Sequence, residues 1–144
     1  MSEIPAGMEL MDSMRKPPRP TVTIMLTKSG NNGPKVLLGK REETMPSFPG
    51  YWAFPGGGVS KIDNKAAETL GIENRLAALF REMVEELGFT IENGKIKPVP
   101  DSIQARVLTE KSAWFELAQS SALPFSEDGI RLISERTTPP FGPH

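Results

Sequence analysis

The chain has 144 residues, of which 38% are hydrophobic and 24% charged, and these values fit one ordinary globular domain with its own core. A formal charge of -1 gives no overall basic field, so the composition argues against binding to nucleic acid or to anionic lipid. The absence of cysteine excludes disulfides and every cysteine-ligated metal site. No signal-peptide core and no long apolar run is found, so we expect a cytoplasmic protein that does not enter a membrane.

The N-terminal third of the chain predicts an arm, a β-hairpin and a loop, in that order. Residues 1–20 mix proline, glycine and methionine without a sustained period, which predicts a flexible arm. Apolar residues then alternate with threonine over 21–28, which predicts a strand. Turn residues over 29–34 are followed by the segment 35–42, in which a short apolar run, Val36 to Leu38, leads into Lys40 and Arg41, and this completes the predicted hairpin. Proline, glycine and aromatic residues over 43–58 predict a loop.

The C-terminal third predicts a second hairpin, a helix and a strand. The dipeptide Asn93-Gly94 favours a type I′ turn and is flanked by short β-like runs. Asp101 is expected to cap a helix over 102–121 that breaks near its middle. The segment 129–138 predicts a strand.

Between these parts lies an acidic helix. The segment REMVEELGF begins at Arg81 and places Glu82, Glu85 and Glu86 at i, i+3, i+4 spacing, so that their carboxylates share one side. A separate apolar face is formed by Leu76, Leu79, Phe80, Met83 and Leu87. Arg81 can reach Glu85 at i+4 but cannot neutralise three carboxylates, so we expect a hard divalent cation such as Mg2+. The alternative is a solvated surface helix.

The order of residues in this segment resembles the second half of the signature of the Nudix hydrolase family. WAFPGGGV, Trp52 to Val59, is similar to the loop that precedes the catalytic helix of that family, and the matching regions run over residues 21–94. The resemblance implies an α/β fold, an α-β-α sandwich with a mixed β-sheet, over residues 21–144. Only 55 residues follow Phe89, and many of them have a helical pattern although the family fold needs further strands there. We therefore expect a fold that is incomplete at the C-terminus, either because the chain is truncated or because it is the N-terminal portion of a larger protein.

The chain departs from the family pattern at one acidic position. Five residues should separate the last glycine from a further glutamate, but counting from Gly58 gives Asn64. Glu73 stands where the pattern has that glutamate relative to Arg81, eight residues before it. We therefore predict an insertion over roughly residues 60–72, which a surface loop accepts at small cost. An insertion here also resembles the branch of the family that contains coenzyme A diphosphatases.

The resemblance implies a role for each acidic residue and for the arginine. Glu82, Glu85 and Glu86 would bind Mg2+ or Mn2+, and Arg81 with Glu73 would orient them. Spacing does not decide which glutamate is the general base, and Glu85 is our expectation. For Glu73 the alternative is an N-terminal helix acid that interacts favourably with the helix dipole.

The resemblance also implies contacts with the substrate. Gly56, Gly57 and Gly58 would let the backbone turn tightly beside the metal and the phosphates. Arg41 would contact a phosphate or the base, and its alternative is a surface cation. Trp52 would stack on the base, and its alternative is packing within the loop.

The implied reaction is hydrolysis of the diphosphate linkage in a nucleoside diphosphate derivative, such as coenzyme A, ADP-ribose or a dinucleotide, by a metal-activated water. The alternative is a Nudix-like nucleotide-binding or regulatory module without turnover. A sheet edge exposed by the short C-terminus would favour pairing of two copies into a homodimer.

Overall fold

The computed structural model describes residues 8–10, 19–46, 48–137 and 141–143. The chain divides into two compact units, one formed by Pro20–Ile130 and the other by Met1–Arg19 together with Arg131–His144. The predicted flexible arm, residues 1–20, falls mostly outside the described residues. Among the helices that the structure describes, none has the length and apolar character needed to cross a membrane.

The first predicted strand divides between two partners. β2 (Thr21–Thr23) pairs antiparallel with β7 (Gly56–Gly58). β3 (Thr27–Lys28) pairs antiparallel with β4 (Lys35–Val36), which confirms the first predicted hairpin. The prediction of a continuous loop up to Gly58 was wrong, because backbone hydrogen bonds to β2 outweigh the low strand propensity of glycine.

Two further antiparallel pairs involve short strands. β5 (Gly39–Lys40) pairs with β6 (Trp52–Ala53) in the larger unit. In the smaller unit β1 (Met8–Leu10) pairs with β10 (Phe141–Pro143). The strands of the described segments form five two-stranded sheets in all, so the mixture of helices and strands is as expected while the β-structure consists of small pairs.

The second predicted hairpin is confirmed. β8 (Phe89–Glu92) pairs antiparallel with β9 (Lys95–Pro98). Asn93 and Gly94 between them have φ values of +52° and +72°, as both central residues of a type I′ turn require.

The predicted insertion folds into a helix. α1 (Lys61–Leu70) begins with a capping box, in which the Ser60 side chain accepts from the Asp63 N–H while the Asp63 carboxylate accepts from the Ser60 N–H. It ends at Gly71, whose φ of +69° is the left-handed conformation common after helices. Asp63 lies in the first turn of α1.

The acidic helix consists of two parts. α2 (Asn74–Glu82) continues into one π-helical turn, η1 (Met83–Leu87), which ends at Gly88. Phe80 and Met83 are buried, which confirms the predicted apolar face. π-helical turns within α-helices are found frequently at functional sites.

The last predicted helix forms with the predicted break. α3 (Asp101–Thr109) and α4 (Ser112–Gln119) are separate helices. The predicted capping role of Asp101 was wrong, because Pro100 occupies the cap position and Asp101 is already helical. The predicted strand over 129–138 was also wrong, since residues 129–137 form no strand and the structure describes no strand that pairs with them.

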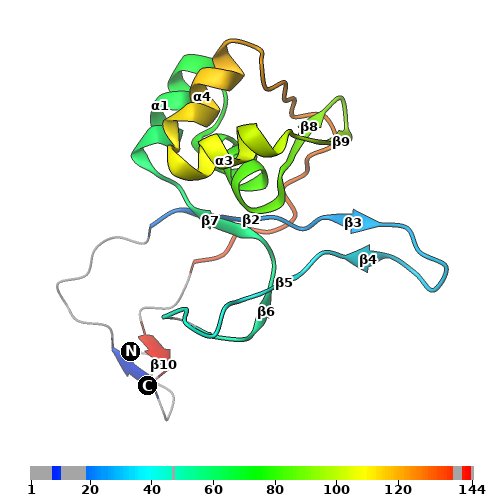
Figure 1. Cartoon of the computed structure of the whole chain (residues 1–144). Coiled ribbons are helices and arrows are strands. Elements are labelled where there is room, and N and C mark those ends of the chain that lie inside the picture. Colours follow the sequence, from blue (N-terminus) through cyan, green and yellow to red (C-terminus); the bar gives the residue numbers. More distant parts are fainter. Residues whose placement is uncertain (1–7, 11–18, 47, 138–140, 144) are drawn as a thin grey trace. The chain divides into compact units, whose positions relative to one another are not determined.

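The core of the larger unit lies among the helices. α1 packs against α2 and α4, and α3 packs against α4 and η1, as the cluster of helices in Figure 1 shows. Its largest fully buried apolar side chains are Phe80, Met83, Val84, Val107, Trp114 and Leu123. This packing fixes α2 and η1, and β7 also packs against α2.

Candidate functional site

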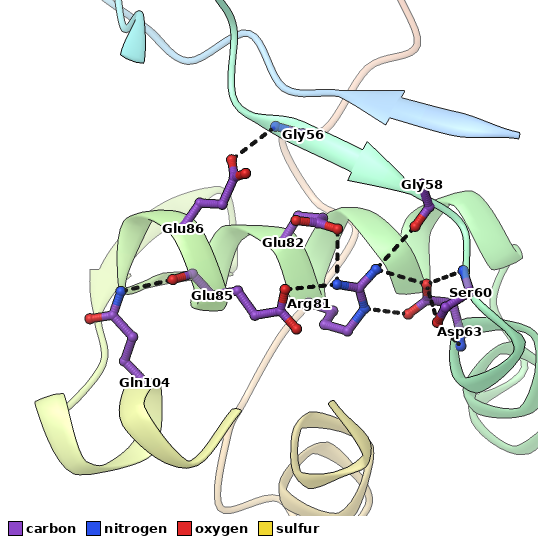
Figure 2. Close-up of polar contacts among 9 residues, drawn as sticks. All are labelled: Gly56, Gly58, Ser60, Asp63, Arg81, Glu82, Glu85, Glu86 and Gln104. Atoms are coloured by element: carbon purple, nitrogen blue, oxygen red, sulfur yellow. Dashed lines mark hydrogen bonds and ion pairs between the residues drawn. The ribbon is translucent and has the colours of Figure 1, made fainter. Parts of the chain in front are cut away.

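Arg81 is the centre of a buried polar cluster (Figure 2). Its Nε and Nη2 donate to the two carboxylate oxygens of Asp63 at 2.7 and 2.9 Å. Its Nη1 donates to Glu82 and Glu85, at 2.9 Å each, and Nη2 also donates to the carbonyl of Gly58 at 3.2 Å. A guanidinium has five N–H groups, so every donor of Arg81 has an acceptor.

Asp63 and Arg81 are both charged in this arrangement. Both side chains are 0% exposed. Burial raises the pKa of Asp63, but hydrogen bonds from Arg81 and Ser60 outweigh it and hold that pKa below its usual range. Burial lowers the pKa of Arg81, while Asp63, Glu82 and Glu85 together raise it above its usual value. The pair is therefore a two-bond ion pair without solvent, in which removal of either partner leaves a buried charge.

The acid that holds Arg81 is Asp63, a residue that the sequence reasoning missed. Glu73 is exposed at the start of α2, makes no capping hydrogen bond with its side chain, and finds no free donor on Arg81. Counting five residues from Gly57 instead of Gly58 would have found Asp63. The extra residues then lie between Asp63 and Arg81, which are 18 positions apart.

The three glycines bring the backbone against the acidic helix. A Cβ atom at Gly57 would lie 2.2 Å from Oε1 of Glu82, so no other residue fits there without moving that carboxylate. The N–H of Gly56 donates to Oε2 of Glu86 at 3.1 Å, as Figure 2 shows. With the Gly58 carbonyl on Arg81, all three glycines touch the cluster through contacts that need the close approach of β7.

Glu85 and Glu86 carry negative charge that Arg81 only partly compensates. Burial raises the pKa of Glu85 above its usual range, against the opposing effect of Arg81. Its Oε1 is buried and has no hydrogen-bond partner among the described residues. Partial burial raises the pKa of Glu86 too, and the charges of Glu82 and Glu85 add to this, while the Gly56 N–H lowers it. The Glu86 residue keeps contact with solvent, so it is the less constrained of the two.

The chemistry of this cluster suits a hard cation. In the conformation described, no three acidic side chains of the described residues converge closely enough to hold a metal ion. The unpartnered Oε1 of Glu85 is nevertheless an anionic oxygen that a cation would satisfy. A donor set made entirely of carboxylate oxygens is the set that Mg2+ and Mn2+ prefer.

Gln104 holds the end of the acidic helix and was not predicted. Its Nε2, on α3, donates to the backbone carbonyl of Glu85 at 3.0 Å (Figure 2). A Cβ atom at Gly88 would lie 2.9 Å from the Gln104 Oε1, so the glycine leaves room for this amide. No local pattern indicates the contact, because the two residues are 19 positions apart and meet only through packing of α3 on η1.

Two predicted substrate contacts lie on the strand pair β5–β6. Arg41 directly follows β5, and its charge lowers the pKa of Glu86, so it lies near that carboxylate. Trp52 is the first residue of β6 and is 65% exposed. The structure therefore brings Arg41 toward the acidic cluster and leaves Trp52 in solvent.

Comparisons with known proteins show the family to which the chain is related. A family model described as "NUDIX domain" matches residues 17–129. A solved structure described as a NUDIX hydrolase from Alicyclobacillus acidocaldarius is similar to the chain, with 25% sequence identity and a TM-score of 0.60. The similarity covers 78% of this chain and 58% of that one, so the chain spans little more than half the length of its structural neighbour. No curated protein matches the chain significantly.

Proposed function

We propose that this chain, which belongs to the Nudix family, is a hydrolase that cleaves the diphosphate linkage of nucleoside diphosphate derivatives with the help of Mg2+ or Mn2+. The observation that carries the proposal is the buried arginine with three carboxylates around it. Arg81 contacts Asp63, Glu82 and Glu85, so the negative charges outnumber the positive charge in a site with little solvent. A structural ion pair needs only one carboxylate.

Some residues of the cluster would bind the cation, and the others would position these ligands. Glu82, Glu85 and Glu86 would hold the cation, and Oε1 of Glu85 is the oxygen that Arg81 leaves without a donor. A bound divalent cation lowers the pKa of water and neutralises developing charge on a phosphoryl group. Arg81 fixes the carboxylates of Glu82 and Glu85, and Asp63 fixes Arg81.

The direction of the pKa shift of Glu85 supports its proposed role as the general base. Its raised pKa lies closer to neutrality than that of an ordinary glutamate, as a proton acceptor at physiological pH requires. The Gly56 N–H holds Glu86 instead, which leaves Glu86 to the metal.

We propose coenzyme A derivatives as the first substrates to test, and then ADP-ribose and dinucleotides. Support for this order is the helix α1, which fills the insertion that resembles the coenzyme A diphosphatase branch. Arg41 would contact a phosphate of the substrate from the side of Glu86. We propose the cytoplasm as the place of activity, on the strength of a composition without cysteine.

The test is a hydrolysis panel with Mg2+ and with Mn2+ over coenzyme A, ADP-ribose, NADH and diadenosine polyphosphate. Glu86→Gln is the active-site variant, and Glu127→Gln is the matched control at an exposed loop position. We expect cleavage that depends on the metal, is lost in Glu86→Gln and is unchanged in Glu127→Gln. Metal-independent cleavage, or equal rates in the two variants, would refute the proposal. Binding of a nucleotide without cleavage by the folded protein would favour the binding-module alternative.

A further inference from the structure

The hairpin that carries Arg41 also brings two aromatic rings together. Phe48, Pro49, Gly50 and Tyr51 form a turn in which the Tyr51 N–H donates to the Phe48 carbonyl at 3.4 Å. Proline at the second position and glycine with φ of +72° at the third are the features of a type II turn. The turn places the rings of Phe48 and Tyr51 edge to face, with centroids 6.0 Å apart.

Both rings are exposed, and one is held at an unfavourable backbone angle. Tyr51 is 65% and Phe48 is 61% exposed. Phe48 has a φ of +48°, a left-handed conformation that is rare for a bulky residue. Strain of this kind concentrates at functional sites. An exposed aromatic pair on a strained turn is therefore a candidate for contact with a ligand.

A β-bulge decides which side of the hairpin Tyr51 faces. The Arg41 N–H donates to the Tyr51 carbonyl at 2.8 Å, and the Gly50 N–H donates to the Arg41 carbonyl at 3.1 Å. Two residues, Gly50 and Tyr51, thus oppose the single residue Arg41, with left-handed glycine at the first bulge position. One step further along the strands, Lys40 pairs directly with Trp52.

The strand alternation follows from this pairing. Lys40 and Trp52 are directly opposite each other, so their side chains share one face of the hairpin. Neighbouring residues in a strand point to opposite faces, so Arg41 and Tyr51 lie together on the other face. Bulges next to active sites commonly redirect a side chain in this manner.

The hairpin and the chain that follows it reach the acidic cluster at two points. Arg41 acts electrostatically on the Glu86 carboxylate. The chain runs from β6 through Phe54 and Pro55 to Gly56, the first residue of β7, whose N–H donates to the same carboxylate at 3.1 Å. Tyr51 shares the hairpin face of Arg41, whose charge acts on Glu86.

We propose that Tyr51, supported edge-on by Phe48, is the stacking site for the nucleobase of the substrate, with Arg41 between the base and the carboxylates. The inference rests on the proposed function, since it concerns the same substrate. A guanidinium suits the phosphates, and an exposed phenol ring suits a base of any kind, because every base has an aromatic face. The expectation from sequence placed the base on Trp52, which lies on the opposite face. The two assignments therefore make opposite predictions.

The experiment compares binding of AMP with binding of ribose 5-phosphate, its counterpart without a base, by isothermal titration calorimetry in the presence of Mg2+. Neither compound contains a diphosphate linkage, so turnover does not enter the measurement. In the wild-type protein we expect AMP to bind roughly 5- to 150-fold more tightly than ribose 5-phosphate. This ratio should persist in Tyr51→Phe, which keeps the ring, and fall to about one in Tyr51→Leu. It should also persist in Trp52→Leu.

A ratio near one in the wild-type protein, or undetectable binding of AMP, would overturn the stacking site. Loss of the preference in Trp52→Leu with retention in Tyr51→Leu would overturn it in favour of the other face. Thermal unfolding of each variant checks that it is folded, and Tyr51→Phe separates loss of the ring from loss of the fold. A preference for AMP in a protein that cleaves nothing would refute the hydrolase proposal alone, and hydrolysis without a preference would refute the stacking site alone.

Discussion

Replacing Asp63 by asparagine tests the assignment of Asp63 as the acid that holds Arg81. The substitution keeps the size of the side chain but removes its charge and replaces one carboxylate oxygen by an N–H2 group. Asp63 accepts hydrogen bonds from Arg81 Nε and Nη2 and from the Ser60 N–H, and only one acceptor atom would remain for these donors. Arg81 would keep Glu82 and Glu85 on its Nη1, but its Nε or Nη2 would face a buried donor in place of an acceptor.

The expected loss of unfolding free energy in Asp63→Asn follows from the burial of the ion pair. Both side chains of the ion pair are 0% exposed, so the pair belongs to the class whose disruption costs about 3–5 kcal/mol. Domains of this size are stabilised by roughly 5–15 kcal/mol in total. We therefore expect the midpoint of thermal unfolding to fall on the order of 10–20 °C. Because the pKa of Asp63 is lowered in the folded protein, its contribution is present above the unfolded value of about 3.9 and is lost as pH falls through the folded value.

The assay is urea unfolding followed by circular dichroism at pH 7, with Glu73→Gln as the matched control. Glu73 is exposed and Arg81 has no donor left for it, so that variant should stay within about 0.5 kcal/mol of the wild-type protein. Repeating both measurements near pH 3 should narrow the difference between Asp63→Asn and the wild-type protein. Equal destabilisation by the two substitutions, or a difference that does not change with pH, would refute the assignment.

Three other perturbations address the remaining contacts of the site. Gly57→Ala should lower activity on the order of 100-fold, because its Cβ would meet the Glu82 carboxylate at 2.2 Å, whereas Gly39→Ala, which meets nothing within 4 Å, should leave activity unchanged; equal rates would contradict the need for close approach. Gln104→Leu should lower the free energy of unfolding by about 1–3 kcal/mol, since the carbonyl of Glu85 loses its donor, and a urea curve identical to that of the wild-type protein would show that this contact is dispensable. Burial raises the pKa of Glu85, so in the metal-free protein ionisation of this carboxylate should reduce stability as pH rises from about 4.3 through the raised value. Added Mg2+ should therefore raise the unfolding temperature more at pH 7.5 than at pH 5, and a shift independent of pH would contradict metal binding by the ionised carboxylate.

The contacts that sequence alone predicted correctly are local ones. The turn at Asn93-Gly94 needs only two adjacent residues that accept positive φ, and asparagine and glycine are the residues that do so most readily. The Arg81–Glu85 contact, at 2.9 Å, follows from the i+4 geometry of any helix. Burial of Phe80 follows from the apolar period around it. The turn and the Arg81–Glu85 contact join residues within one turn of each other, so their geometry does not depend on the rest of the fold. Phe80 follows the apolar period, but its ring packs against the distant Trp114 and Phe125.

The remaining features were decided by the tertiary structure, because their partners are distant in sequence. Glu73 matched the expected spacing to Arg81, yet packing of α1 on α2 brings Asp63 to the guanidinium and fills its donors first. Gly56–Gly58 has the composition of a loop but becomes a strand because β2 supplies hydrogen-bond partners. The segment 129–137 has the composition of a strand but, within the described structure, has no strand to pair with. A strand is stabilised by the strand beside it, and a buried ion pair by the side chains around it. A local stretch of sequence contains only one of the two partners, so it does not determine whether the strand or the ion pair forms.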